Sequence, residues 1–148
     1  MALLTKQRLL ELGKISPVLV NIQFPNGQET DVYMLDGRSG RSVGEEMGFV
    51  QEIGAYNDKH QFISSQANIN KVMAFNMIQF LCDEQGQPLY KREELDGLLE
   101  LPEDIINTIG VAIHKQHTIE RHKKHKTMLE KAEQDEKNTT ELQDSANT

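Results

Sequence analysis

The sequence lacks tryptophan, has a single cysteine and contains no long apolar run. A lone cysteine, Cys82, cannot form an internal disulfide, so the fold is expected not to depend on an oxidising compartment. No segment reaches the roughly 18 consecutive apolar residues of a membrane-spanning helix. The first residues alternate leucine with charge and are not typical of a signal peptide. We therefore expect a cytoplasmic protein that does not bind membranes, with Cys82 as a small buried apolar residue.

Positive charge is also scarce. The 148 residues include 16 lysines and arginines against 23 aspartates and glutamates, for a formal net charge of -7. Binding to nucleic acid requires clustered positive charge to neutralise phosphates, so this balance argues against a nucleic-acid partner. The length indicates one domain with a single core.

The N-terminal part predicts a short helix followed by a β-hairpin. Leucines and charged residues alternate up to Leu12, and Gly13 then ends the predicted helix. Residues 18–24 and 28–34 are rich in β-branched side chains, and Asn26-Gly27 between them is a strong hairpin turn signal. An isolated hairpin is marginally stable in water, so it must pack on a helix, and its strand edges are expected to be open to a partner.

Residues 35–48 predict a glycine-rich loop that becomes ordered on binding or assembly. Its glycines are Gly37, Gly40, Gly44 and Gly48. Their spacing matches neither of the common phosphate-binding glycine motifs. Arg38 and Arg41 lie in this loop and are candidates to contact a partner.

The C-terminal half predicts helices. Apolar residues recur at helical spacing over residues 67–81, and again from Pro102 onwards, with a short leucine-rich helix over residues 91–100 between them. After Leu129 apolar residues almost disappear. The sequence therefore predicts an α+β fold, a mainly α-helical small bundle with an N-terminal β-hairpin near residues 18–34. Residues 1–129 form the predicted domain, and residues 130–148 a disordered or frayed C-terminal tail.

A calcium-binding loop is suggested by Asp83 and Glu94, which stand at the first and last ligand positions of a twelve-residue loop. The position that requires glycine for a sharp turn is occupied by Pro88, and neutral Gln85 and Gln87 stand where acidic ligands are usual. The segment is better explained as a turn in which a glycine ends one helix before the next begins.

Four histidines, His114, His117, His122 and His125, fall in one predicted helix. Three of them share a face at helical spacing, but no cysteine or acidic residue completes a zinc pattern, and neighbouring lysines add positive charge. We interpret this stretch as a solvated basic face that could dock an acidic partner, and we assign no metal or cofactor.

No enzyme activity is predicted. Ser64 and Ser65 lie in a polar turn without the context of a serine nucleophile. The acidic pairs Glu45-Glu46 and Glu103-Asp104 are most simply helix-start charges.

Residues 75–113, FNMIQFLCDEQGQPLYKREELDGLLELPEDIINTIGVAI, resemble the tail assembly chaperones of long-tailed (siphovirus-type) bacteriophages. The shared pattern is a helix, an acidic-glycine turn, a short apolar-aromatic step, a leucine-rich helix, a Leu-Pro break and a final apolar helix. Val32-Tyr33 matches a pair that follows the β segment in this family. The resemblance covers roughly residues 15 to 120.

The resemblance implies a protein of the host cell cytoplasm that is absent from the mature virion. Such chaperones bind the phage tape measure protein and keep it soluble. A longer form, made by a ribosomal frameshift, recruits the tail tube protein. The codons for Glu136-Lys137-Asn138 could contain a slippery sequence, at which the ribosome changes reading frame. Weak homo-oligomerisation is expected. The candidate partner-binding residues are Val32, Tyr33, Arg38 and Arg41.

Two other functions remain open at this point. One is a phage head-tail connector or tail completion protein, which would stay in the virion as a ring. The other is a small regulatory adaptor or metal sensor that uses the histidine-rich helix.

Overall fold

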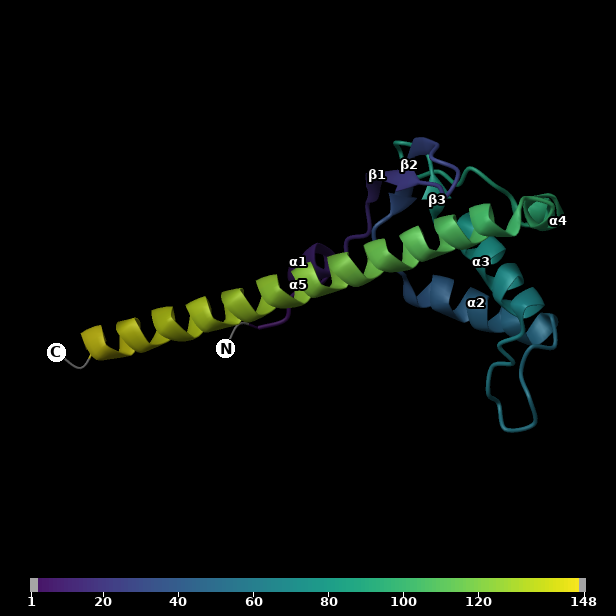
Figure 1. Ribbon diagram of the computed structural model, residues 1–148. Coiled ribbons are helices and arrows are strands. Elements are labelled where there is room, and N and C mark those ends of the chain that lie inside the picture. Colours follow the sequence, from purple (N-terminus) through teal and green to yellow (C-terminus); the bar gives the residue numbers. More distant parts are fainter. Residues whose placement is uncertain (1–2, 147–148) are drawn as a thin grey trace. The chain divides into compact units, whose positions relative to one another are not determined.

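The computed structural model describes residues 3–146, with side chains for all of these except residues 124, 128 and 135–146. The order of elements is α1 (Lys6–Leu12), β1 (Pro17–Gln23), β2 (Glu29–Leu35), α2 (Gly40–Glu52), α3 (Gln66–Phe80), β3 (Leu81–Cys82), the 3₁₀ turn η1 (Arg92–Glu94), α4 (Leu95–Leu99) and α5 (Glu103–Ala146) (Figure 1). The predicted α+β class, with an N-terminal hairpin and a mainly helical remainder, is confirmed.

Contacts divide the chain into two compact units. The central unit is Ile15–His117, and the terminal unit combines Met1–Lys14 with Thr118–Thr148. Helix α5 contributes residues to both. The domain bounds predicted from the sequence, 1–129 with a tail at 130–148, stay a prediction.

The β-hairpin forms as predicted, with strand ends shifted by one residue. Strands β1 and β2 pair in antiparallel register from Pro17↔Leu35 to Gln23↔Glu29. At the turn, Gly27 has a φ of 85°, a left-handed conformation that favours glycine. The Asn26 side chain accepts a hydrogen bond from the Gln28 N–H at 3.0 Å. The Asn26-Gly27 pair therefore specifies the hairpin through the backbone geometry of its turn.

A third strand, β3, was not predicted. Helix α3 ends at Phe80, and Leu81 and Cys82 adopt an extended conformation in which they pair with Met34 and Tyr33. The predicted helix was one residue too long because apolar content alone does not distinguish a buried strand from a buried helix end. As a result β2 is the central strand of the sheet, in the order β1-β2-β3.

The acidic-glycine turn follows β3 instead of ending a helix. One Asp83 carboxylate oxygen accepts hydrogen bonds from the N–H groups of Gln85 and Gln87, each at 2.9 Å. Gly86 adopts a left-handed φ of 84°, and Pro88 forms a β-bridge back to Cys82. Asp83 is therefore engaged in holding the turn.

The glycine-rich loop prediction was wrong, because residues 40–52 form α2. The Ser39 side chain caps this helix by accepting a hydrogen bond from the Ser42 N–H at 3.0 Å. Phe49 and Val50 are buried near its C-terminal end. Each glycine lowers helix propensity by about 1 kcal/mol, but packing of an apolar face commonly overrides propensity.

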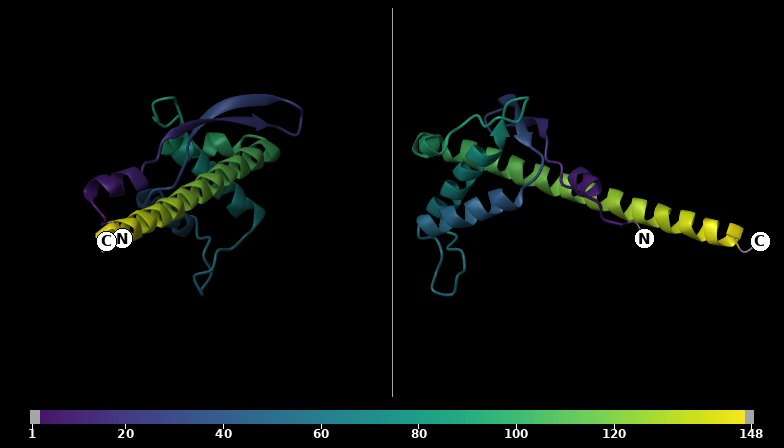
Figure 2. Two further views of the ribbon diagram at one scale, coloured as in Figure 1. Left: turned by 90° about the vertical axis from the view of Figure 1, so that its left-hand side faces the viewer. Right: turned by 180° about the vertical axis from the view of Figure 1, so that it is seen from behind.

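The core of the central unit lies between the sheet, α2, α3, α4 and the first part of α5. Its largest fully buried side chains are Met34, Met77, Phe80, Ile106 and Ile113. The sheet lies at the top of this unit in Figures 1 and 2, and the loop between α2 and α3 projects at the bottom.

In the terminal unit, α1 ends at Gly13 as predicted, and it begins after Thr5. The Thr5 side chain accepts a hydrogen bond from the Arg8 N–H at 3.0 Å, and the Gly13 N–H donates to the Leu9 carbonyl at 2.9 Å. Figure 2 shows α1 beside the middle of α5. Helix α5 extends to Ala146, and the last two residues of the predicted tail, 147–148, lie outside the described residues. Within the described part of the chain, none of the helices is both long and apolar enough to cross a membrane.

The buried Cys82 thiol is expected to be unreactive in the folded protein. Burial raises the pKa of Cys82, and the neighbouring Asp83 carboxylate raises it further, so little of the nucleophilic thiolate forms. A thiol reagent at about pH 8 should label Cys82 slowly in buffer and rapidly in denaturant. Equal labelling rates in the two conditions would show that β3 does not protect the thiol.

Candidate partner-binding groove

A groove of about 620 Å³ opens on the central unit beside α2 and α3. We call it the apolar groove, and its walls include Leu35, Arg41, Gly48, Phe49, Phe75 and Tyr90. Its volume falls within the range of protein sites that enclose a ligand or several partner side chains.

Two stacked phenylalanines form the floor of the apolar groove. Phe49 comes from the last turns of α2 and Phe75 from α3, and both are buried. Their ring centroids are 4.4 Å apart with an interplanar angle of 4°. Because each ring belongs to a different helix, the stack fixes the spacing of α2 and α3 and therefore the width of the groove.

Arg92 covers this stack. Its guanidinium carbon lies 5.0 Å from the Phe49 ring centroid and 5.7 Å from that of Phe75. The Glu52 carboxylate is 3.4 Å from the same guanidinium. This ion pair is exposed, so by itself it contributes little stability, but it orients Arg92 over the rings.

The rim of the groove carries both signs of charge. Arg41, Glu45 and Glu52 line it on α2, and Arg92 lines it from η1. Gln79 ties α3 to the start of α2, since its side-chain N–H donates to the Ser42 carbonyl at 2.8 Å. An apolar floor with a mixed-charge rim suits an amphipathic helix, whose apolar side chains enter the groove while its charged side chains meet the rim.

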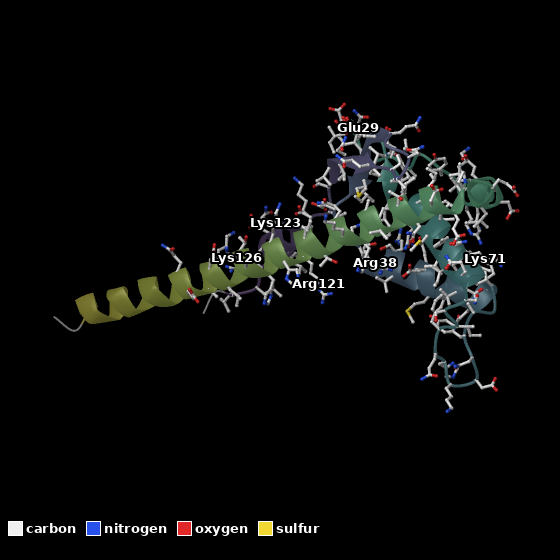
Figure 3. All side chains as sticks on the ribbon, in the orientation of Figure 1. Glu29, Arg38, Lys71, Arg121, Lys123 and Lys126 are labelled. Atoms are coloured by element: carbon white, nitrogen blue, oxygen red, sulfur yellow. The ribbon has the colours of Figure 1, made fainter. Side chains whose placement is uncertain are left out.

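Of the four residues proposed from the sequence, the structure brings Arg41 to the groove. Arg38, labelled in Figure 3, lies in the central unit. It forms an ion pair with Glu46, and its guanidinium carbon is 6.0 Å from the Phe80 ring centroid. Val32 packs against the core. Tyr33 pairs with β3 on one side and β1 on the other.

The expectation that both hairpin edges are open is therefore wrong in part. Tyr33 and Met34 are paired on both sides, because β3 adds to β2. Within the described residues, no strand covers the outer edges of β1 and β3. On the β3 side of β2, Glu29–Val32 and Leu35 are also not paired with a strand.

Phe49, Phe75 and Arg92 were missed by sequence reasoning. They come from segments far apart in the chain, and treating residues 35–48 as a loop hid the helix that positions Phe49. Phe75 belongs to the apolar stripe of residues 67–81, and that stripe predicted only a position in the hydrophobic core. For Arg92 the sequence carries no signal, since its role depends on a fold that stacks two rings beneath it.

The prediction that the histidine-rich stretch is a solvated face is wrong for His117. His117 is partly buried, with its Nε2 2.9 Å from the Leu35 carbonyl oxygen and its ring edge-on to Phe80 at 4.5 Å. His114, His122 and His125 are exposed. Among the residues that the structure describes, no three metal-ligating side chains come together.

The stability of the central unit is expected to fall below about pH 6.5, through His117. Burial lowers the pKa of His117 from its ordinary 6.5, with Arg38 and His114 acting in the same direction and the Leu35 carbonyl and Asp36 opposing. The unfolded chain therefore binds the proton first as pH falls, and stability present above pH 6.5 is lost below it.

Urea unfolding of wild type and His117→Gln between about pH 7.5 and pH 5.5 checks this. Glutamine keeps a donor for Leu35 and does not titrate, so its midpoint should depend less on pH. The same pH dependence in both proteins would exclude His117 as the cause.

Comparison of the chain with protein-family models, with curated proteins and with solved structures finds no match.

Proposed function

We propose that this protein is a phage tail assembly chaperone that holds the tape measure protein in the apolar groove. The observation that carries the proposal is the groove itself, in which stacked Phe49 and Phe75 form an apolar floor between charged rims. The resemblance of residues 75–113 to such chaperones agrees with it and supplies the identity of the partner.

A tape measure protein is a long helical chain that aggregates when its apolar stripes are exposed. The groove would cover one such stripe, because a helix presents apolar side chains at three- and four-residue spacing along one face. Each copy would cover only a short stretch, so many copies would be needed for one partner chain. The net charge of -7 would keep the coated complex soluble.

The rest of the proposal follows from the same role. The protein would act in the host cytoplasm, associate weakly with other copies while bound, and leave before the virion is complete. A frameshift-extended form would recruit the tail tube protein. No catalytic step is required, and we propose none.

Coexpression with the tape measure protein of the same phage tests the proposal. We expect the tape measure protein to move from the insoluble to the soluble fraction and to copurify with many copies of this chain. A control strain that expresses the tape measure protein alone sets the background. No rescue and no copurification would contradict the proposal, and recovery of this chain as rings in finished virions would favour a head-tail connector instead.

A further inference from the structure

Strand β1 lies at one edge of the sheet, and its outer side pairs with no strand in the described part of the chain (Figure 1). Just before β1, the Asp36 N–H donates to the Ser16 carbonyl at 2.9 Å. Just after it, the Phe24 N–H donates to the Gln28 carbonyl at 2.8 Å. Bonded positions alternate along an antiparallel pair, so the even-numbered residues of β1 bond to β2 and the odd-numbered ones point their backbone groups outward. The outward residues are Pro17, Leu19, Asn21 and Gln23.

Other open parts of the sheet are protected against pairing with a second sheet, in ways that proteins commonly use. The Glu29–Val32 stretch of β2 carries two carboxylates. Strand β3 has only two residues, and the Leu89 N–H covers it by donating to the Leu81 carbonyl at 3.1 Å. Strand β1 has seven residues, no charge and no bulge, and its proline stands at the first position. Among the described strands, the edge of β1 is therefore the most open to pairing.

Leu19 is 58% exposed, although the residues on either side of it, Val18 and Val20, pack against the core. Side chains alternate between the two faces of a strand, so Leu19 lies on the outer face of the sheet. A second copy of β1, running antiparallel, can place its own Leu19 directly opposite this one. The two leucines then cover each other, and Val18 of each copy faces Val20 of the other.

We propose that two copies of this protein pair through β1, antiparallel and in the register that sets Leu19 opposite Leu19. The two Leu19 residues exchange both of their backbone hydrogen bonds in this register. The Asn21 N–H of each copy donates to the Pro17 carbonyl of the other. Pro17 has no N–H to donate, and proline is tolerated at such an outward position of an edge strand. The two sheets become one, in the order β3-β2-β1-β1-β2-β3.

Charge and symmetry favour a second copy over another partner. The net charge is -7, so most contacts between copies bring like charges together. Strand β1 carries no charge, and pairing it with itself sets no charged side chain opposite another. An interface of one strand pair is small, which makes the association weak and reversible. It would supply the weak association between copies that the proposed function includes, and in that respect it rests on the proposed function.

Charge variants at Leu19 test the pairing in the full-length protein without any partner. By sedimentation equilibrium we expect wild type to dimerise reversibly between about 10 μM and about 1 mM. Leu19→Lys alone, or Leu19→Glu alone, sets two like charges opposite each other and should weaken dimerisation at least about tenfold. An equimolar mixture of the two variants sets opposite charges together and should dimerise again. Thr30→Lys, at an exposed position of β2, should leave dimerisation unchanged.

Cysteine variants test the register. Opposed residues that exchange both hydrogen bonds have Cα atoms about 5.5 Å apart, which suits a disulfide. Gln23→Cys is the matched control, because Gln23 is exposed on the same edge but would lie more than about 20 Å from its copy. The native Cys82 is buried and adds little background. Under mild oxidation we expect Leu19→Cys to form linked dimers at least about tenfold faster than Gln23→Cys.

The following results would overturn the proposal. Wild type that stays monomeric up to about 1 mM does not pair in this way. A mixture of folded Leu19→Lys and Leu19→Glu that does not dimerise shows that Leu19 does not meet its copy, and equal linking of the two cysteine variants shows that no register is fixed. If the chain alone is monomeric but Leu19→Lys loses the coexpressed tape measure protein, the edge binds a partner strand. Because these tests use the chain alone first, their failure is distinct from a failure of tape measure binding.

Discussion

Replacing Phe80 by alanine should lower the free energy of unfolding of the central unit by about 3–5 kcal/mol. Phe80 is 2% exposed and is among the largest fully buried side chains. It contacts the edge of the His117 ring and lies beneath the Arg38 guanidinium. Its removal leaves a cavity at the end of α3, where that helix passes into β3. Since small domains are stable by only about 5–15 kcal/mol, a loss of this size is a large fraction of the total.

Urea unfolding followed by tyrosine fluorescence measures this effect. The chain has no tryptophan, and its three tyrosines, Tyr33, Tyr56 and Tyr90, all lie in the central unit, so the signal reports that unit. Phe62→Ala is the matched control, because Phe62 is 40% exposed and its loss should cost less than about 1 kcal/mol. Similar losses in the two variants would mean that Phe80 does not occupy the core.

Gly48→Leu should abolish most binding of the tape measure protein while leaving the fold intact. Gly48 lines the apolar groove, and a Cβ added there meets no described atom within 4 Å apart from its chain neighbours and the nearby backbone of its own helix. A leucine side chain would therefore extend into the space that a partner helix needs. We expect the amount of copurified tape measure protein to fall at least about tenfold, equivalent to about 1.4 kcal/mol of binding free energy.

Gly44→Leu provides the control one helical turn away. Gly44 lies on the same helix and has the same open surroundings, but it is not part of the groove wall. Both substitutions replace glycine in a helix, so both should stabilise α2 by up to about 1 kcal/mol. Equal copurification by the two variants would show that the partner binds elsewhere.

Elements with a strong local signal could be predicted from the sequence. The Asn26-Gly27 turn and the β-branched residues around it determine the hairpin, and apolar spacing identifies α3 and α5. The C-terminal stop of α1 at Gly13 is also a local effect. In each of these cases the residues that specify the structure are adjacent or lie within a few turns of one another.

Elements that depend on distant residues were missed. Helix α2 contains Gly40, Gly44 and Gly48, which favour a loop locally, and it forms because Phe49 and Val50 are buried against the rest of the unit. Strand β3 has two residues and exists only through its pairing with Tyr33 and Met34.

The candidate site was missed for the same reason. Its floor and cover combine α2, α3 and η1. Periodicity identifies which side chains are buried, but it does not show which buried rings will meet or which arginine will cover them. Arg41 was selected as a polar residue in a loop and is found on the groove wall as part of a helix.

Site-specific photo-crosslinking within the coexpressed complex tests the central claim most directly. The photoreactive residue is placed at Glu45, which lines the apolar groove, or at Val43, which is 38% exposed on α2 and is not part of the groove wall. We expect strong crosslinks to the tape measure protein from position 45 and few from position 43. Equal crosslinking from both positions, or none from position 45 in a soluble complex, would contradict binding in the groove.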